Sequence, residues 1–158
     1  DFGLIIKPKK PKLLKEKLGK TYLMLQKAKA TNRCFVFENH DENHVKNFKD
    51  IPAKIAKACD LTIHDTLMAG TAGLESALVG TKSVFFDYYK SKNNQFEEKG
   101  LNIVFRNWNS LWEEIEKDYN KKSSINLGDW SQIIDKFDKF RDGKANLRII
   151  DFIKNLEK

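Results

Sequence analysis

Cysteine is scarce in this chain, and long apolar runs are missing. The sequence holds two cysteines, Cys34 and Cys59, among 158 residues. Each lies among apolar neighbours, where a free thiol behaves as a small hydrophobic side chain, so a disulfide framework is not indicated. No apolar stretch approaches the length that crosses a bilayer, and the start lacks a charged segment followed by an apolar one. We therefore expect a soluble, cytoplasmic protein, and association with the inner face of the membrane stays open.

Several familiar catalytic and ligand-binding motifs are also absent. The sequence contains no GxGxxG fingerprint, no Walker A loop and no Gly-x-Ser-x-Gly elbow. His40 and His44 lie one helical turn apart, but the glutamate that a metalloprotease helix carries directly after its first histidine is missing, and no third ligand is evident. We interpret this segment as a polar loop and expect no metal site.

The charge of the chain is positive. Its 29 lysines and arginines outnumber its 22 acidic residues, for a formal charge of +7, and lysines are densest between residues 7 and 20. Such a cluster favours anionic partners: nucleic acid, an acidic membrane surface or phosphorylated sugars. It is equally typical of a solvated lysine-rich helix, so charge alone does not choose among these.

Short apolar runs alternate with helical patterns along the chain. Because the runs are continuously apolar, they indicate buried parallel strands with helices on both faces of the sheet. The length fits one domain, and the start at Asp1 instead of Met suggests a piece of a longer polypeptide. We expect one Rossmann-like α/β/α domain over residues 1–158, with a mostly parallel sheet. The expected strands are 4–7, 34–38, 61–63, 83–86 and 103–105. The expected helices are 12–30, as one long helix or two broken ones, and 52–58, 71–79, 111–119, 130–137 and 147–156.

The segment 60–87 is the most informative part of the sequence. It is typical of a strand, a loop of small residues, a short helix ended by Gly80, and a second strand. The start of such a helix has unpaired backbone N–H groups and attracts anions, above all phosphate. Small side chains there leave room for a ligand, and Thr71 is expected to cap the helix. The small residues in question are Gly70, Thr71, Ala72 and Gly73.

Three segments are expected at the carboxyl edge of the sheet, where open parallel sheets bind ligands. Lys7 and Lys9 follow the first strand and supply positive charge. His64 ends the third strand and is able to donate to a phosphate or sugar oxygen near neutral pH, although a purely structural histidine fits equally well. Glu75, one turn into the helix, is suited to accept hydrogen bonds from ribose or sugar hydroxyls. Together these groups suit a nucleotide; in the alternative, the small residues only pack the helix and Glu75 is solvated.

Three stretches, in this order, resemble one enzyme family. The segment 4–10, LIIKPKK, resembles the "IKPK" strand ending of bacterial capsule and lipopolysaccharide transferases. The segment 58–87 is similar to their "G-T-x-x-L-E-A-L-x-x-G-K" core, and 140–149, FRDGKANLRI, resembles their "DGKASxRI" segment. The chain thus resembles the C-terminal, donor-binding domain of a GT-B glycosyltransferase of surface polysaccharide biosynthesis, which is one half of a GT-B fold. Asn146 departs from the usual serine, and His64 stands where small residues are common.

This resemblance implies a transferase that uses a CMP-, UDP- or CDP-linked sugar, without a cofactor or metal. It implies that residues 70–73 hold the donor phosphate, that Glu75 contacts the ribose or sugar, and that Lys7 or Lys9 neutralises charge. The acceptor, a saccharide or glycolipid, and the catalytic base would come from an N-terminal domain that this sequence lacks. The chain alone is then expected to bind the donor without turnover.

The resemblance further implies that Asp142 and Arg148 fix the final helix near the site. Two alternatives stay open. One is a sugar-nucleotide 2-epimerase, whose halves resemble GT-B domains, and the other is a basic module that binds nucleic acid or a membrane surface, although no RNA-binding fingerprint is present. Trp108, Trp112 and Trp130 lie at helical spacings and are interpreted as core residues instead of base-stacking ones.

Overall fold

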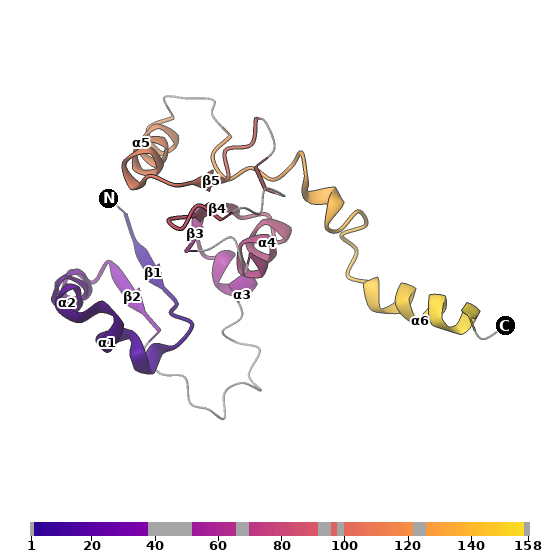
Figure 1. Cartoon of the computed structure of the whole chain (residues 1–158), viewed down its shortest axis with the longest axis horizontal. Helices are drawn as coiled ribbons and strands as arrows, with labels where there is room; N and C mark the ends of the chain where they lie inside the picture. The colour runs from indigo at the N-terminus through magenta and orange to yellow at the C-terminus, as the bar shows by residue number, and fades with distance from the viewer. Residues whose placement is uncertain are drawn as a thin grey trace. The chain divides into compact units, whose positions relative to one another are not determined.

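A computed structural model describes residues 2–37, 52–65, 70–91, 96–97, 100–121 and 126–156. The protein is α/β with parallel strands, as predicted, and it divides into two compact units, 1–49 and 50–158. Figure 1 traces the elements of both units along the chain. Each unit is described by itself, and the expectation of one domain over residues 1–158 stays a prediction.

The first unit holds a two-stranded parallel sheet, β1 (Leu4–Ile6) and β2 (Cys34–Val36), in which Ile5 lies opposite Phe35. The helical segment between the strands is broken at Gly19, whose φ of 50° interrupts a regular helix. Val36 and Leu25 are buried, whereas the side chains of Ile5 and Phe35 stay exposed on the other face of the sheet. The helical pieces are η1 (Pro11–Leu13), α1 (Leu14–Leu18), η2 (Gly19–Thr21) and α2 (Tyr22–Ala30).

The second unit is built on a three-stranded parallel sheet. Its strands are β3 (Leu61–His64), β4 (Lys82–Phe86) and β5 (Val104–Phe105), in the order β3-β4-β5. His64 lies opposite Phe85, and Phe86 lies opposite Phe105, so the carboxyl ends of the three strands meet at one edge. The helices of this unit are α3 (Pro52–Ala56), α4 (Thr71–Leu78), α5 (Trp108–Tyr119), η5 (Ile134–Lys136) and α6 (Ala145–Leu156).

Two apolar clusters cover the two faces of this sheet, and alternate residues of β4 enter each of them. Phe85 points to the face covered by α4, and Val84 points to the face covered by α5, which Figure 1 shows on opposite sides of the sheet. Burial of a Phe side chain contributes about 2 kcal/mol, so Phe85 stabilises the packing of α4 on the sheet. The first cluster contains Phe85, Phe96, Ile103, Trp130, Ile133 and Ile134, and the second contains Val84, Phe105, Leu111, Ile115 and Leu127.

The segment 130–137 differs from its prediction. Instead of a regular helix it forms turns and the short η5, because the Asp129 carboxylate accepts from the backbone N–H and hydroxyl of Ser131 at 2.8 and 3.1 Å. Such local bonds compete with a helix. The indole of Trp130 donates to the carbonyl of Ser83 at 2.8 Å, and Gly128, with a φ of 66°, comes so close that a Cβ there would lie 2.7 Å from the N of Ser83. Residues 128–130 therefore pack directly against β4.

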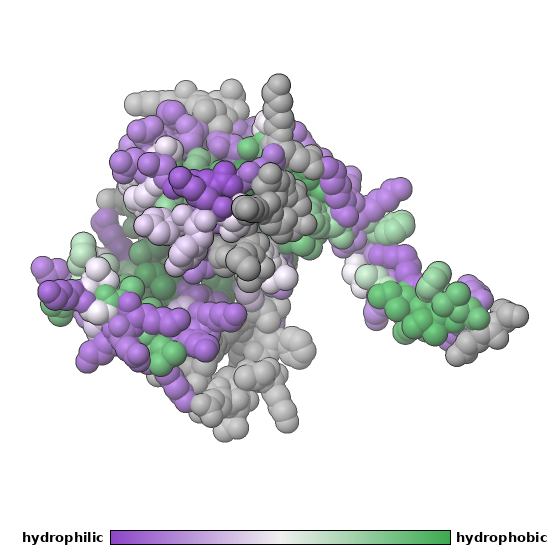
Figure 2. Space-filling model, in the orientation of Figure 1, coloured by the Kyte–Doolittle hydropathy of each residue, from purple (hydrophilic) through white to green (hydrophobic). Residues whose placement is uncertain are grey.

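The last helix, α6, exposes its apolar side chains. Ile149, Phe152 and Leu156 are 60%, 64% and 70% exposed, and Figure 2 shows hydrophobic atoms gathered over this helix. Among the described residues, no helix is both long enough and apolar enough to cross a membrane.

Candidate functional site

The candidate site lies at the carboxyl edge of the sheet in the second unit (Figure 1). His64 ends β3, Asp87 follows β4 and Arg106 follows β5, so the register of the parallel strands places all three at this edge. Helix α4 starts after the connection from β3, of which the structure describes Asp65 and Gly70. Ligands bind at this edge in open parallel sheets.

The start of α4 differs in one respect from the prediction. Its N-cap is Gly70, with φ −60° and ψ 4°, a residue without a side chain that could cap the helix. The prediction that Thr71 caps the helix was therefore wrong, because Thr71 is already its first residue. The first hydrogen bond of the helix runs from Leu74 N to Gly70 O at 3.0 Å. The amides of the first turn have no partner inside the helix.

Gly73 is buried against the sheet. A Cβ at this position would lie 2.5 Å from Cζ of Phe85 and 3.3 Å from Cδ2 of His64. The glycine is therefore required for α4 to pack on β4. Packing of small residues was the alternative that the sequence left open, and a role for Gly73 in ligand approach stays a prediction.

His64 is half-buried between β4 and α4. Its Nε2 lies 3.4 Å from Oγ of Ser76, and its ring lies 6.0 Å from the Phe85 ring, centroid to centroid. The Ser76 hydroxyl donates to the carbonyl of Ala72 at 2.8 Å. Burial lowers the pKa of His64, and the nearby carboxylate of Asp65 opposes this effect. The site therefore holds a neutral imidazole near pH 7.

The other predicted site residues lie at several places. Glu75 is exposed on α4. Lys7 is half-buried and Lys9 is exposed; both follow β1 and belong to the first unit. Their participation in one site with α4 stays a prediction.

Asp142 and Arg148 form an ion pair at the start of α6. Nη1 of Arg148 lies 3.0 and 2.9 Å from the two carboxylate oxygens of Asp142, and the guanidinium stacks 4.2 Å from the centre of the Phe140 ring. The backbone N–H of Lys144 also donates to Asp142, and this bond, together with Arg148, lowers the pKa of the carboxyl. The pair fixes the entry to the final helix, and its proximity to the donor stays a prediction.

A network of charged and polar side chains on the same edge was not predicted from the sequence. The carboxylate of Asp87, which is 1% exposed, accepts from the backbone N–H and the hydroxyl of Ser91 at 2.7 and 2.8 Å. Nε of Arg106 lies 3.4 Å from Asp87, and the same guanidinium pairs with Glu97. Such partners are needed because a buried carboxylate without them would cost about 3–5 kcal/mol. The only signal was an aspartate directly after an apolar strand.

Exposed aromatic rings stand beside this network. Tyr88 and Tyr89, directly after Asp87, are 71% and 83% exposed, and their ring centroids lie 5.6 Å apart. Trp108 packs edge-on against Phe86 and is 51% exposed. The interpretation of the tryptophans as core residues is confirmed for Trp130, which is 3% exposed, and wrong for Trp108 and Trp112.

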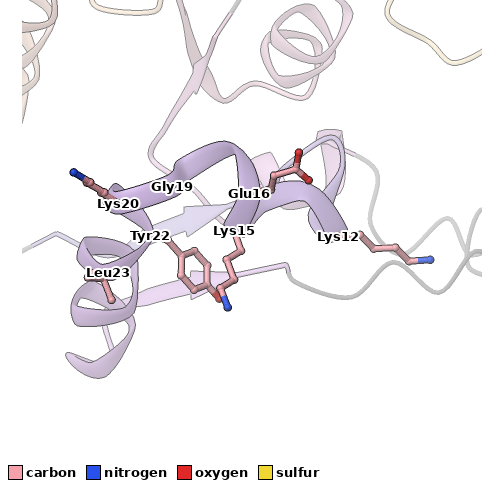
Figure 3. A pocket seen from close by; sticks show the side chains of 7 residues that line it. All are labelled: Lys12, Lys15, Glu16, Gly19, Lys20, Tyr22 and Leu23. Carbon is pink, nitrogen blue, oxygen red and sulfur yellow. The ribbon is translucent and has the colours of Figure 1, made fainter.

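A depression of about 620 Å³ lies in the first unit. Figure 3 shows that the side chains of Lys12 and Lys20 point away from each other and that Glu16 points away from Lys15. The lysines therefore do not surround a common anion. The residues that line the depression are Lys12, Lys15, Glu16, Gly19, Lys20, Tyr22 and Leu23.

Over the ranges that the structure describes, no group of three histidine, cysteine or acidic side chains is placed to hold a metal ion. The segment 40–44, interpreted above as a polar loop, lies outside these ranges. No protein-family model, curated protein or solved structure matches this chain.

Proposed function

We propose that the chain binds a nucleotide-sugar donor at the carboxyl edge of β3 and β4, as the donor domain of a GT-B glycosyltransferase of surface polysaccharide biosynthesis. One observation carries this proposal: α4 starts at that edge with no side chain on its cap. A diphosphate or monophosphate would accept hydrogen bonds from the amides of the first turn. The exposed rings of Tyr88 and Tyr89 are available on the same edge for a nucleobase.

In the proposed reaction, the bond between the anomeric carbon of the sugar and the phosphate oxygen breaks, and the carbon bonds to an acceptor oxygen. The electron pair leaves with the phosphate, where the helix amides stabilise the negative charge. The proton of the acceptor hydroxyl goes to a base from another domain of the enzyme. The acceptor is a saccharide or glycolipid, and the chain alone would bind the donor without turnover.

Thermal protection by nucleotides tests the donor site. CMP, UDP and CDP are added separately, and the nucleotide that binds should raise the melting temperature, because a ligand at a hundredfold its Kd stabilises by about 2.7 kcal/mol. If none of the three raises it, the proposal is wrong.

A charge variant separates binding from folding. Thr71→Glu places a carboxylate at the start of α4, which favours the helix by about 0.3–1 kcal/mol but repels phosphate. The protein should stay folded and lose the protection by nucleotide. The matched control is Asn109→Glu in the first turn of α5, where the same charge should leave protection unchanged. Equal protection in both variants would contradict the assignment to α4.

The epimerase and the basic binding module stay predictions, since no contact among the described residues favours either one. The arrangement of the lysines around the depression in the first unit gives the basic module no support (Figure 3).

A further inference from the structure

The ring of His64 has a defined orientation. Nε2 faces Oγ of Ser76 at 3.4 Å, and Cδ2 faces Gly73, where a Cβ would lie 3.3 Å away. These two ring atoms are neighbours, and both face α4. Nδ1 lies on the opposite side of the five-membered ring and therefore points away from α4.

The hydrogen bonds of Ser76 favour one position of the imidazole proton. A serine hydroxyl has a single proton, and that of Ser76 is used in the 2.8 Å bond to the carbonyl of Ala72. Toward His64, Oγ of Ser76 then acts as an acceptor, which favours the tautomer with the hydrogen on Nε2. Ser76 is 1% exposed, which keeps water from replacing this bond. In a neutral imidazole with a proton on Nε2, Nδ1 is a hydrogen-bond acceptor.

The charge of the ring follows from its surroundings. Phe85 and α4 bury it, which lowers the pKa of His64, and the carboxylate of Asp65 is the group that raises it. A neutral Nδ1 carries a lone pair, and so does each oxygen of a phosphate. The two would repel each other, so the partner of Nδ1 has to be a hydrogen-bond donor.

We propose that Nδ1 of His64 accepts a hydrogen bond from a hydroxyl group of the bound nucleotide or of its sugar, and that Ser76 is a positioning residue that holds this tautomer. The inference rests on the proposed function and deepens it. Anion binding is then left to the amides of α4, and His64 selects for a hydroxyl-bearing ligand. This differs from the sequence-based prediction, in which His64 donates to a phosphate or sugar oxygen.

Two substitutions separate the two ring nitrogens. In His64→Gln the amide nitrogen can replace Nε2 and keep the bond to Ser76, whereas in His64→Asn the amide oxygen can replace Nδ1. We expect His64→Gln to melt close to the wild type and to bind nucleotide about 10-fold more weakly, the size of one lost hydrogen bond. We expect His64→Asn to melt lower but to bind within about twofold to threefold of the wild type at a temperature where it is folded. The reverse order of affinities would overturn the proposal.

A second set of binding measurements varies the ligand. It uses UDP, CDP and CMP, the 2′,3′-dideoxy form of whichever nucleotide binds, and UDP-glucose. If a ribose hydroxyl is the partner, removal of both ribose hydroxyls weakens binding to the wild type but not to His64→Gln. If a sugar hydroxyl is the partner, His64→Gln weakens UDP-glucose more than UDP. If neither of these two differences in binding is observed, no ligand hydroxyl reaches Nδ1 and the proposal is wrong.

The tautomer is measurable without any ligand. Nitrogen-15 NMR of the His64 ring should show a protonated Nε2 and an unprotonated Nδ1, and Ser76→Ala should shift the ring toward a mixture of tautomers. A protonated Nδ1 in the wild type would overturn the inference and leave the proposed function standing. A wild type that binds none of the nucleotides, with the expected tautomer, would overturn both.

Discussion

Helices α4 and α5 follow β3 and β5, the strands on either side of β4, at the same edge of one sheet, but they start differently. At α5 the residue before the helix, Asn107, has an extended backbone, and its side chain accepts from the backbone N–H of Ser110 at 3.2 Å. At α4 that residue is Gly70, which has no side chain for the purpose. A cap of the first kind satisfies the helix amides within the protein. The residue before α4 therefore offers no such acceptor, and in our proposal the phosphate of the ligand takes that place.

The largest expected effect concerns the packing that positions α4. Gly73→Ala places a methyl group 2.5 Å from the Phe85 ring and should lower the free energy of unfolding by about 1–3 kcal/mol, as overpacking does. Urea unfolding followed by circular dichroism measures this. The control is Gly3→Ala, where the nearest atom to the new Cβ is 4.0 Å away, so little change is expected. Equal stability of both variants would mean that α4 does not pack on β4 as described.

The second effect concerns the cap of α5. Asn107→Ala removes the acceptor for Ser110 N–H and should lower the free energy of unfolding by about 1 kcal/mol. Nucleotide protection should be unchanged, because this helix start is not the proposed site. The matched control is Asn109→Ala, within the same helix, which loses no cap. A loss of nucleotide protection in Asn107→Ala would remove the distinction between the two helix starts.

The smallest effect is a pH dependence. Because burial lowers the pKa of folded His64 below its unfolded value, the unfolded state binds more protons as the pH falls through that value. The wild type should therefore lose stability below about pH 6.5 relative to His64→Gln, and the two should run parallel at higher pH. Melting temperatures from pH 5 to 8 measure this. A wild type that gains stability on acidification, relative to the variant, would contradict the burial of a neutral ring.

Much of the secondary structure could be predicted from the sequence. The parallel strands start within a residue of their expected positions. Short, continuously apolar runs bounded by polar residues are typical of buried strands and fit few other structures. The helix expected at 130–137 was wrong because its apolar spacing also serves a turn fixed by Asp129. A helical spacing of apolar residues is visible in the sequence, whereas a single local side-chain hydrogen bond that competes with the helix is not.

The elements around the candidate site were predictable in part. The start of a helix after β3 followed from small residues next to a strand. The packing role of Gly73 was not decided, because Phe85 is distant in sequence and its contact with the glycine is set by the fold. The pairing of Asp87 with Arg106 was missed for the same reason, since the two residues meet only when β4 and β5 lie side by side.

The most direct measurement of the central claim is an amide NMR titration of the second-unit residues in the full chain with UDP, CDP and CMP. The account predicts that the largest shifts, with one of these nucleotides, fall on the backbone N–H groups at the start of α4, from Thr71 to Gly73, while those of residues 108–110 at the start of α5 stay in place. Shifts confined to the lysines of the first unit, or equal shifts at both helix starts, would contradict it.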